Sequence, residues 1–262
     1  MWATLITVSI FGLIIGNVEA GPKHLPSYIT ACKRNDPELN KCCLEQARIA
    51  LPHIVDGDKR YGIPSFKPMK LEKVSVNSGN LKIDLKDIEL YGLPDADIQD
   101  LAVDLKKQTV KIVFKCPQIV ILGKYVMDGK ILVLPLNGAG DANVTIDNPV
   151  FTYTSDYKLV NKDGLDYAQL GDRNELSYDM TRVYFKFDNL FNGNEQLSKS
   201  THEVANAEWR AIVEEMSPGI KAAVRSIAGL LVNSIAARVL MTGYFWLKID
   251  FFICIEIYLV IS

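Results

Sequence analysis

Five cysteines carry the most distinctive chemistry in this sequence, because paired thiols form disulfides and clustered thiols hold zinc. Cys32 and Cys42 are close in sequence, and Asn35-Asp36-Pro37 between them can turn the chain. A bridge that closes this loop would stabilise the fold by about 3 kcal/mol. Cys43 is the competing partner for Cys32. The sequence has no C-x-x-C pair, so a zinc site is not indicated and we expect no bound metal.

Nucleophilic catalysis has little support in the sequence. A Ser-His-Asp site needs a histidine that lies beside both an acid and a nucleophile. The three histidines, His24, His53 and His202, lie in no nucleophile motif, and neither a G-x-S-x-G motif nor a glycine-rich phosphate loop occurs. The remaining cysteines, Cys116 and Cys254, are far apart, and the odd count leaves at least one thiol free or intermolecular. We therefore expect neither an enzyme nor a cofactor.

The first twenty residues are typical of a secretory signal peptide. Leu5 to Ile15 is an apolar run that is too short to cross a bilayer core. Val18-Glu19-Ala20 has small residues at the two positions that a signal peptidase reads. We predict that residues 1–20 are removed and that the mature chain is secreted into an extracellular fluid. An amino-terminal membrane anchor is the alternative interpretation.

Secretion also determines how the surface chemistry is interpreted. Asn143-Val144-Thr145 is an N-glycosylation sequon, so Asn143 is a predicted glycosylation site. The formal net charge of -2 argues against a nucleic-acid partner, whose binding domains are strongly basic, and against polybasic membrane docking. Apolar residues make up 48% of the chain, which is enough for a sizeable core.

The elements that must position these residues follow from the hydrophobic periodicity. Asp36-Pro37-Glu38 has the composition of a helix start. The apolar positions that follow have helical spacing: Leu39, Cys43, Ala47, Ala50 and Ile54. From Leu71 to Phe191 the period changes to two, and turn signals such as Asn77-Ser78-Gly79-Asn80 separate the alternating runs. This pattern predicts a long antiparallel sheet with one apolar face and one wet face.

After Gly193 the period returns to that of a helix. One continuous apolar stripe contains Ile212, Met216, Ile220, Val224, Ile227, Leu231, Ile235 and Val239. It predicts a helix of roughly 40 residues that begins near Thr201 and is kinked or divided at Pro218-Gly219. Such a helix needs a long apolar groove, which a curled sheet supplies. The predicted fold class is therefore α+β, with a short amino-terminal helix, many strands and a long carboxy-terminal helix.

Several blocks of this sequence resemble the takeout and haemolymph juvenile-hormone-binding family of insects. The first block runs from Leu25 to Cys42 and contains Cys32-Lys33-Arg34-Asn35-Asp36-Pro37. The later blocks are Tyr61-Gly62-Ile63-Pro64, Tyr91-Gly92-Leu93, Leu134-Pro135-Leu136-Asn137-Gly138-Ala139-Gly140 and Leu190-Phe191-Asn192-Gly193-Asn194. The order and spacing of these blocks carry the resemblance, which covers about residues 25–238.

The resemblance implies an architecture and a class of ligand. It implies one carrier domain over residues 21–239, in which a strongly curved antiparallel sheet wraps the long helix as a TULIP-like super-roll. It also implies a tunnel for a juvenile hormone or another isoprenoid or fatty-acid-like molecule, and a bridge between Cys32 and Cys42. We therefore expect a carrier of a small lipophilic ligand, linked to circadian or feeding signalling. The alternative is an extracellular interaction protein whose ligand tunes its binding to a receptor or another protein partner.

The resemblance and the alternation together suggest which side chains line the tunnel. The apolar candidates are Leu81, Ile83, Leu101, Val103, Ile112, Phe114, Ile131, Val133, Phe185 and Ile227. Tyr125 and Tyr153 could supply a hydroxyl that orients the ligand. A shift of one residue in the register of any strand would exchange its two faces.

Residues 240–262 depart most from the family pattern. Tyr244-Phe245-Trp246-Leu247 continues as an apolar stretch that Lys248, Asp250 and Glu256 interrupt. Three interpretations stand for this atypical tail: a membrane anchor, an extra strand of the sheet, and an artefact of the chosen gene boundary. The charges disfavour the anchor, because each costs about 3 kcal/mol near the centre of a bilayer.

Overall fold

The computed structural model describes residues 27–236, apart from residues 29, 31, 34 and 163–164. The expected signal peptide, residues 1–20, and the atypical tail, residues 240–262, lie outside the described residues. None of the helices in the described range combines the length and the apolar composition needed to cross a membrane.

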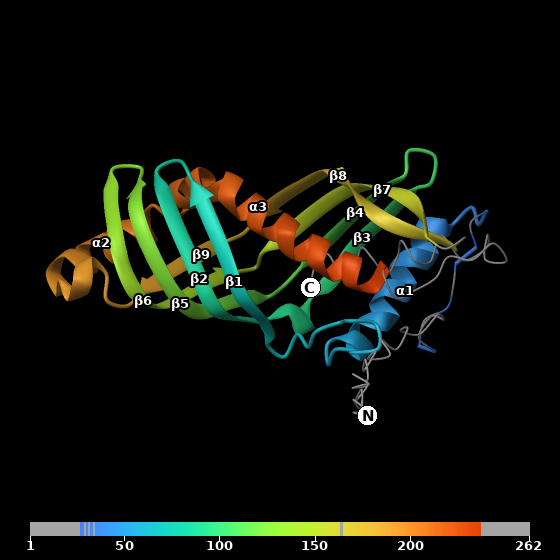
Figure 1. Cartoon of the computed structure of the whole chain (residues 1–262), viewed down its shortest axis with the longest axis horizontal. Helices are drawn as coiled ribbons and strands as arrows, with labels where there is room; N and C mark the ends of the chain where they lie inside the picture. The colour runs from blue at the N-terminus through green and yellow to red at the C-terminus, as the bar shows by residue number, and fades with distance from the viewer. Residues whose placement is uncertain (1–26, 29, 31, 34, 163–164, 237–262) are drawn as a thin grey trace, which may run out of the picture.

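Helices lie at both ends of the described chain, and strands occupy its middle (Figure 1). The helices are α1 (Leu39–Ile54), α2 (Glu195–Ala207) and α3 (Trp209–Ala236), with short 3-10 turns η1 (Leu93–Asp95) and η2 (Phe191–Gly193). The strands are β1 (Met69–Ser78), β2 (Leu81–Tyr91), β3 (Asp97–Asp104), β4 (Thr109–Lys115), β5 (Gln118–Ile131), β6 (Leu134–Asp147), β7 (Val150–Lys162), β8 (Leu165–Asp179) and β9 (Arg182–Phe187). This order confirms the α+β class.

The strands form two antiparallel sheets rather than the single long sheet that the alternation predicted. One sheet has the order β1-β2-β5-β6-β9, and the other has the order β3-β4-β7-β8. In Figure 1 the two sheets occupy opposite ends of an elongated molecule, and α3 runs across both. The helix contacts β1 of the first sheet and β8 of the second. Hydrophobic alternation reports which face of a strand is buried but not which strands pair, so it could not separate one sheet from two.

Helix α1 buries the face that the sequence predicted. Its buried residues are Leu39, Cys43, Ala47, Ala50 and Ile54, and the helix packs on β3. Arg48 Nε donates a hydrogen bond to the Ile98 carbonyl oxygen at 2.9 Å. A disulfide joins Cys32 to Cys42 in the first turn of the helix, which is the pairing that the family resemblance implied. The segment before α1 is therefore covalently tied to this helix, which packs on β3.

The carboxy-terminal helices differ from the sequence prediction. The break falls at Glu208, which separates α2 from α3, and Pro218 lies inside the 28-residue helix α3. Arg182 Nη2 donates to the Asn206 carbonyl oxygen at 2.7 Å, which ties the end of α2 to β9. Helix α3 continues through Pro218 without a break. At Gly219 the helix packs closely against β1, since a Cβ added to this glycine would lie 2.6 Å from the Asn77 carbonyl oxygen. The predicted start near Thr201 and the predicted break at Pro218-Gly219 are therefore wrong. The predicted length of roughly 40 residues is not tested, because residues 237–239 lie outside the described residues.

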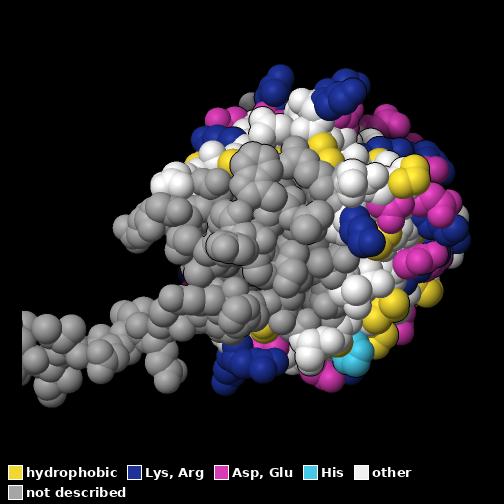
Figure 2. Space-filling view, turned by 90° about the vertical axis from the view of Figure 1, so that its right-hand side faces the viewer, with side chains coloured by type: hydrophobic (Ala, Val, Ile, Leu, Met, Phe, Trp, Pro, Cys, Tyr) yellow, Lys and Arg dark blue, Asp and Glu magenta, His cyan; other side chains and the backbone are white. Residues whose placement is uncertain are grey.

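The described surface at one end of the molecule carries charges of both signs. Figure 2 shows lysine and arginine side chains interspersed with aspartate and glutamate side chains there. This mixture agrees with the formal net charge of -2.

Gly92 allows the chain to leave β2 and cross to the second sheet. Its φ is +95°, and a Cβ added to it would lie 1.9 Å from the Gln118 carbonyl oxygen at the start of β5. Gly79, in the turn between β1 and β2, also has a positive φ of +53°, but an added Cβ would meet only the Glu215 carboxylate, at 3.5 Å. The two glycines therefore share a left-handed backbone and differ in the space around it.

We predict that Gly92→Ala lowers the free energy of unfolding by about 3 kcal/mol or more, because the new methyl group displaces backbone as well as straining φ. Gly79→Ala should lower the free energy of unfolding by only about 1 kcal/mol, because the substitution strains φ and displaces no backbone. Urea unfolding followed by circular dichroism measures both values. Equal losses in the two variants would contradict the packing role of Gly92.

Candidate functional site

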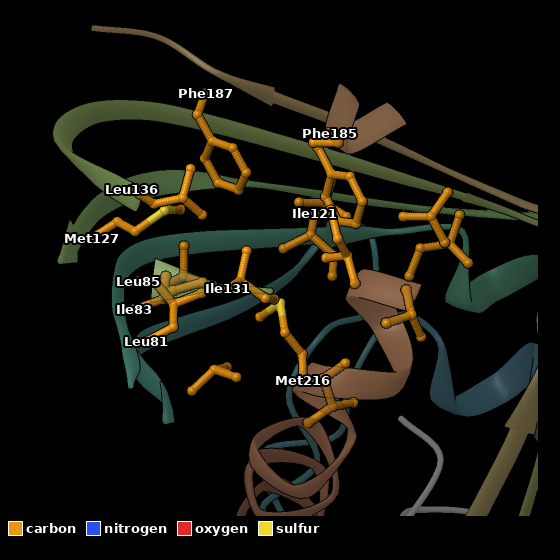
Figure 3. A pocket seen from close by; sticks show the side chains of 18 of the residues that line it. Leu81, Ile83, Leu85, Ile121, Met127, Ile131, Leu136, Phe185, Phe187 and Met216 are labelled. Atoms are coloured by element: carbon orange, nitrogen blue, oxygen red, sulfur yellow. The ribbon is translucent and has the colours of Figure 1, made fainter. Parts of the chain in front are cut away.

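An apolar cavity of about 200 Å³ lies between the five-stranded sheet and the helices α2 and α3. Figure 3 shows side chains from β2, β5, β6, β9 and α3 that converge on this space. The labelled residues are Leu81, Ile83, Leu85, Ile121, Met127, Ile131, Leu136, Phe185, Phe187 and Met216. The polar residues of the wall are Thr201, His202 and Tyr178. A wall of this kind can hold an apolar molecule and offers few polar groups to bind it.

The strand geometry explains why β2 lines this cavity. Leu81, Ile83 and Leu85 alternate along β2 and therefore point to one face, while Lys82 and Asp84 point to the other. Lys82 and Asp84 form an ion pair of 3.6 Å at the surface. The alternation of apolar and charged residues along β2 thus defines the inner wall.

A second apolar cavity, of about 110 Å³, lies toward the four-stranded sheet. Its wall consists of Met69, Leu71, Leu90, Leu93, Phe114, Ile119, Phe151, Tyr153, Leu176, Val224 and Ile227. The described part of the α3 stripe faces both cavities in turn. Ile212, Met216 and Ile220 line the larger cavity, whereas Val224 and Ile227 line the smaller one. The described part of the predicted stripe is therefore a wall that both cavities share.

His202 is the imidazole in the wall of the larger cavity, and both of its ring nitrogens have backbone partners. The Phe187 N–H donates to Nε2 at 2.9 Å, so Nε2 carries no proton. Nδ1 lies 2.8 Å from the Ser198 carbonyl oxygen and donates its proton there. The ring thus holds α2 against β9 through both of its nitrogens.

Two tyrosine hydroxyls in the cavity walls are buried and have no hydrogen-bond partner among the described residues, namely those of Tyr153 and Tyr178. Burial raises the pKa of Tyr153. The Ser155 hydroxyl donates to the Asp156 carbonyl oxygen at 2.9 Å. Tyr153, which the sequence singled out as a hydroxyl donor, is therefore positioned to bind a ligand oxygen.

Tyr125, the other predicted hydroxyl donor, has a different role. Its hydroxyl donates to the Asp188 carbonyl oxygen at 2.8 Å, and the residue lines neither cavity. Burial and the charge of Asp188 raise its pKa to about 12, so the phenol keeps its proton at neutral pH. Tyr125 therefore connects β5 to the chain after β9.

The other predicted residues divide into three groups. Those that line the larger cavity are Leu81, Ile83, Ile131 and Phe185, and those that line the smaller cavity are Phe114, Tyr153 and Ile227. Leu101, Val103 and Ile112 are buried in the core that the four-stranded sheet forms with α1, and they line neither cavity. These residues lie on the inner face of the four-stranded sheet, as predicted, but at the end of this sheet where α1 packs. The binding role of all these residues remains a prediction.

The prediction for Val133 was wrong. Ile131 pairs with Leu134, so Leu132 and Val133 form the turn between β5 and β6. The Val133 side chain is 81% exposed, because alternation between two faces ends where the strand ends. The prediction came from the spacing of Ile131 and Val133, which resembles the alternation within a strand although β5 ends at Ile131.

Sequence reasoning missed the cavity residues of α2 and most of those from β6 to β8. Leu134 and Leu136 alternate along β6, and this pattern was available in the sequence. Thr201, His202 and Ala205 carried no such signal, because α2 is a mostly polar helix.

Two other predicted positions lie away from the cavities. The thiol of Cys116 is free and fully buried, and burial raises its pKa to about 12. Asn143 is half-buried on β6, where its Oδ1 accepts a hydrogen bond from Thr145 Oγ1 at 3.2 Å. Glycosylation of Asn143 remains a prediction.

The fold and the cavities define a class: an α+β protein whose two antiparallel sheets and long amphipathic helix enclose apolar space. Residues 8–245 match the family model for haemolymph juvenile hormone binding protein. The chain belongs to this family, as the motif resemblance indicated.

Three similar proteins illustrate the relationship. The chain is 25% identical over 254 residues to the circadian clock-controlled protein daywake of Drosophila melanogaster, which covers 92% of this chain and 95% of that protein. It is 29% identical over 106 residues to the protein of Schistocerca gregaria named "Putative beta-carotene-binding protein", which covers 40% of this chain and 42% of that protein. The crystal structure of Takeout 1 from Epiphyas postvittana superposes with a TM-score of 0.68 at 25% identity and covers 82% of this chain and all of that one.

We predict that Tyr125→Phe and Tyr153→Phe change stability in different ways. Tyr125→Phe removes a hydrogen bond and strands a carbonyl oxygen, so the free energy of unfolding should fall by about 1 kcal/mol. Tyr153→Phe removes a buried hydroxyl that has no hydrogen-bond partner among the described residues, so stability should stay the same or rise. Urea unfolding of the ligand-free protein tests both. A clear loss in Tyr153→Phe would show that its hydroxyl has a structural partner.

Proposed function

We propose that this protein is a carrier that holds a small lipophilic molecule in the larger cavity. The observation that carries the proposal is a cavity of about 200 Å³ whose wall is formed almost entirely by apolar side chains of two sheets and two helices. A closely packed interior has few voids larger than a water molecule, so an apolar space of this size suits a ligand. The family relationship supports the same role.

Apolar burial is sufficient to drive such binding. A ligand that buries about 300 Å² of apolar surface gains about 7 kcal/mol before the costs of association. One hydrogen bond from Tyr153 or Tyr178 would add about 1 kcal/mol and fix the orientation of the ligand. We propose a binding role rather than a catalytic one, because both nitrogens of His202 are already engaged.

The relatives support a class of ligand and a setting. The name of the Schistocerca protein refers to a carotene, and the family name refers to a juvenile hormone, so we propose an isoprenoid or fatty-acid-like ligand. The name of the Drosophila relative supports a link to circadian output. We further propose that residues 1–20 are a signal peptide and that residues 21–239 are the secreted carrier domain. Mass spectrometry of lipid extracted from the natively secreted protein would identify the ligand.

We predict that Met216→Trp weakens binding at least tenfold. Met216 points into the larger cavity from α3, so a bulkier indole there would occupy the space of the ligand (Figure 3). Titration of the purified protein with a fluorescent lipophilic probe, 1-N-phenylnaphthylamine, measures the affinity.

Val133→Trp is the matched control. It adds the same indole at an exposed turn, so the affinity for the probe should be unchanged. Circular dichroism confirms that both variants are folded. If both variants bind as the unchanged protein does, the probe lies elsewhere and the proposed site is wrong.

A further inference from the structure

Phe151 of β7 is the one described residue that lines both cavities. It lies opposite Phe114 of β4 on one side and opposite Tyr178 of β8 on the other. The rings of Phe114 and Phe151 stack with their centroids 4.9 Å apart and an interplanar angle of 21°. Phe114 lines the smaller cavity and Tyr178 the larger one, so a row of three aromatic side chains crosses the sheet where one cavity gives way to the other.

Other elements divide between the two cavities at the same level. On β5, Ile121 lines the larger cavity and Ile119, two residues earlier on the same face, lines the smaller one. On α3, Ile220 lines the larger cavity and Val224, about one turn later, lines the smaller one. The two cavities therefore lie end to end in one apolar interior, and a single layer of side chains separates them.

We call Phe151 the partition, because it borders both cavities. No polar contact holds its side chain in place. Phe151 has no polar atom in its side chain, and it is half-buried. Its side chain adjoins both cavities, so a rotation about its side-chain torsions can move the ring from one cavity toward the other. This rotation breaks the stacking on Phe114 but no hydrogen bond. Rotamer changes of this kind are common when a ligand binds.

We infer that Phe151 determines the length of ligand that this protein accepts, an inference that rests on the proposed carrier function. With the ring as observed, the larger cavity ends at Phe151 and takes a short apolar chain. A longer unbranched or isoprenoid chain must displace the ring to enter the smaller cavity. Phe151 is thus a specificity-determining residue, and the favoured ligands are those whose apolar part fills the larger cavity alone.

The test is the binding of saturated fatty acids of increasing chain length, from decanoic to docosanoic acid, measured by displacement of 1-N-phenylnaphthylamine. For the unchanged protein, affinity should rise with chain length and then level off when the larger cavity is full. Phe151→Ala should remove the plateau, so that affinity keeps rising by about fourfold for each methylene group that enters the smaller cavity. Phe151→Leu, which preserves more of the packing, should shift the plateau to longer chains and guards against loss of folding in the alanine variant.

Phe187→Ala is the matched control, because Phe187 lines only the larger cavity. This variant should change the affinities for short and long chains by a similar factor and keep the plateau. Length profiles of both Phe151 variants that run parallel to that of the unchanged protein would overturn the partition while leaving the carrier function intact. If the folded, unchanged protein binds no fatty acid and no probe, the carrier function is overturned, and the partition with it.

Discussion

The apolar stripe of α3 is the constraint on which the rest of the structure depends. An amphipathic helix must bury its apolar face, and here two sheets share the task, since the helix contacts β1 of one and β8 of the other. The apolar faces of the two sheets must also be buried, and α3 packs against both sheets. The side chains of α3 and of the two sheets do not fill the space between these elements completely. The two cavities are the space that remains. Among the described residues, the apolar space is thus a result of how the core is packed.

The sequence was most informative where a short period decides burial. Strict alternation along β2 placed Leu81 and Ile83 on the inner face, and they line the larger cavity. Helical spacing in α1 predicted its buried face. These predictions succeeded because each depends only on local geometry: the direction of a side chain follows from its position in a strand or helix. The same reasoning placed Ile227 toward the interior, where it lines the smaller cavity.

The features that the sequence did not predict depend on contacts between segments that are far apart in the chain. Leu101 lies on the inner face of β3 but under α1, and only the packing of that helix distinguishes a core position from a cavity position. The break between α2 and α3 lies beside a bond from Arg182 of β9 to the Asn206 carbonyl oxygen, a long-range contact that no periodicity reports. The division of the strands into two sheets is likewise a matter of pairing. Phe151 could not be singled out, because its position between the cavities is set by strands on both sides of it.

Strand β9 lies at the edge of its sheet, and an exposed edge invites another chain to add a strand. Helix α2 closes this edge with side chains. The Asn206 amide accepts from the Phe185 N–H at 2.7 Å and donates to its carbonyl at 3.0 Å, as a neighbouring strand would, and His202 accepts from the Phe187 N–H. These three backbone groups of β9 are therefore not available to a second molecule. Helix α2 thereby guards this edge of the sheet against pairing with a second chain.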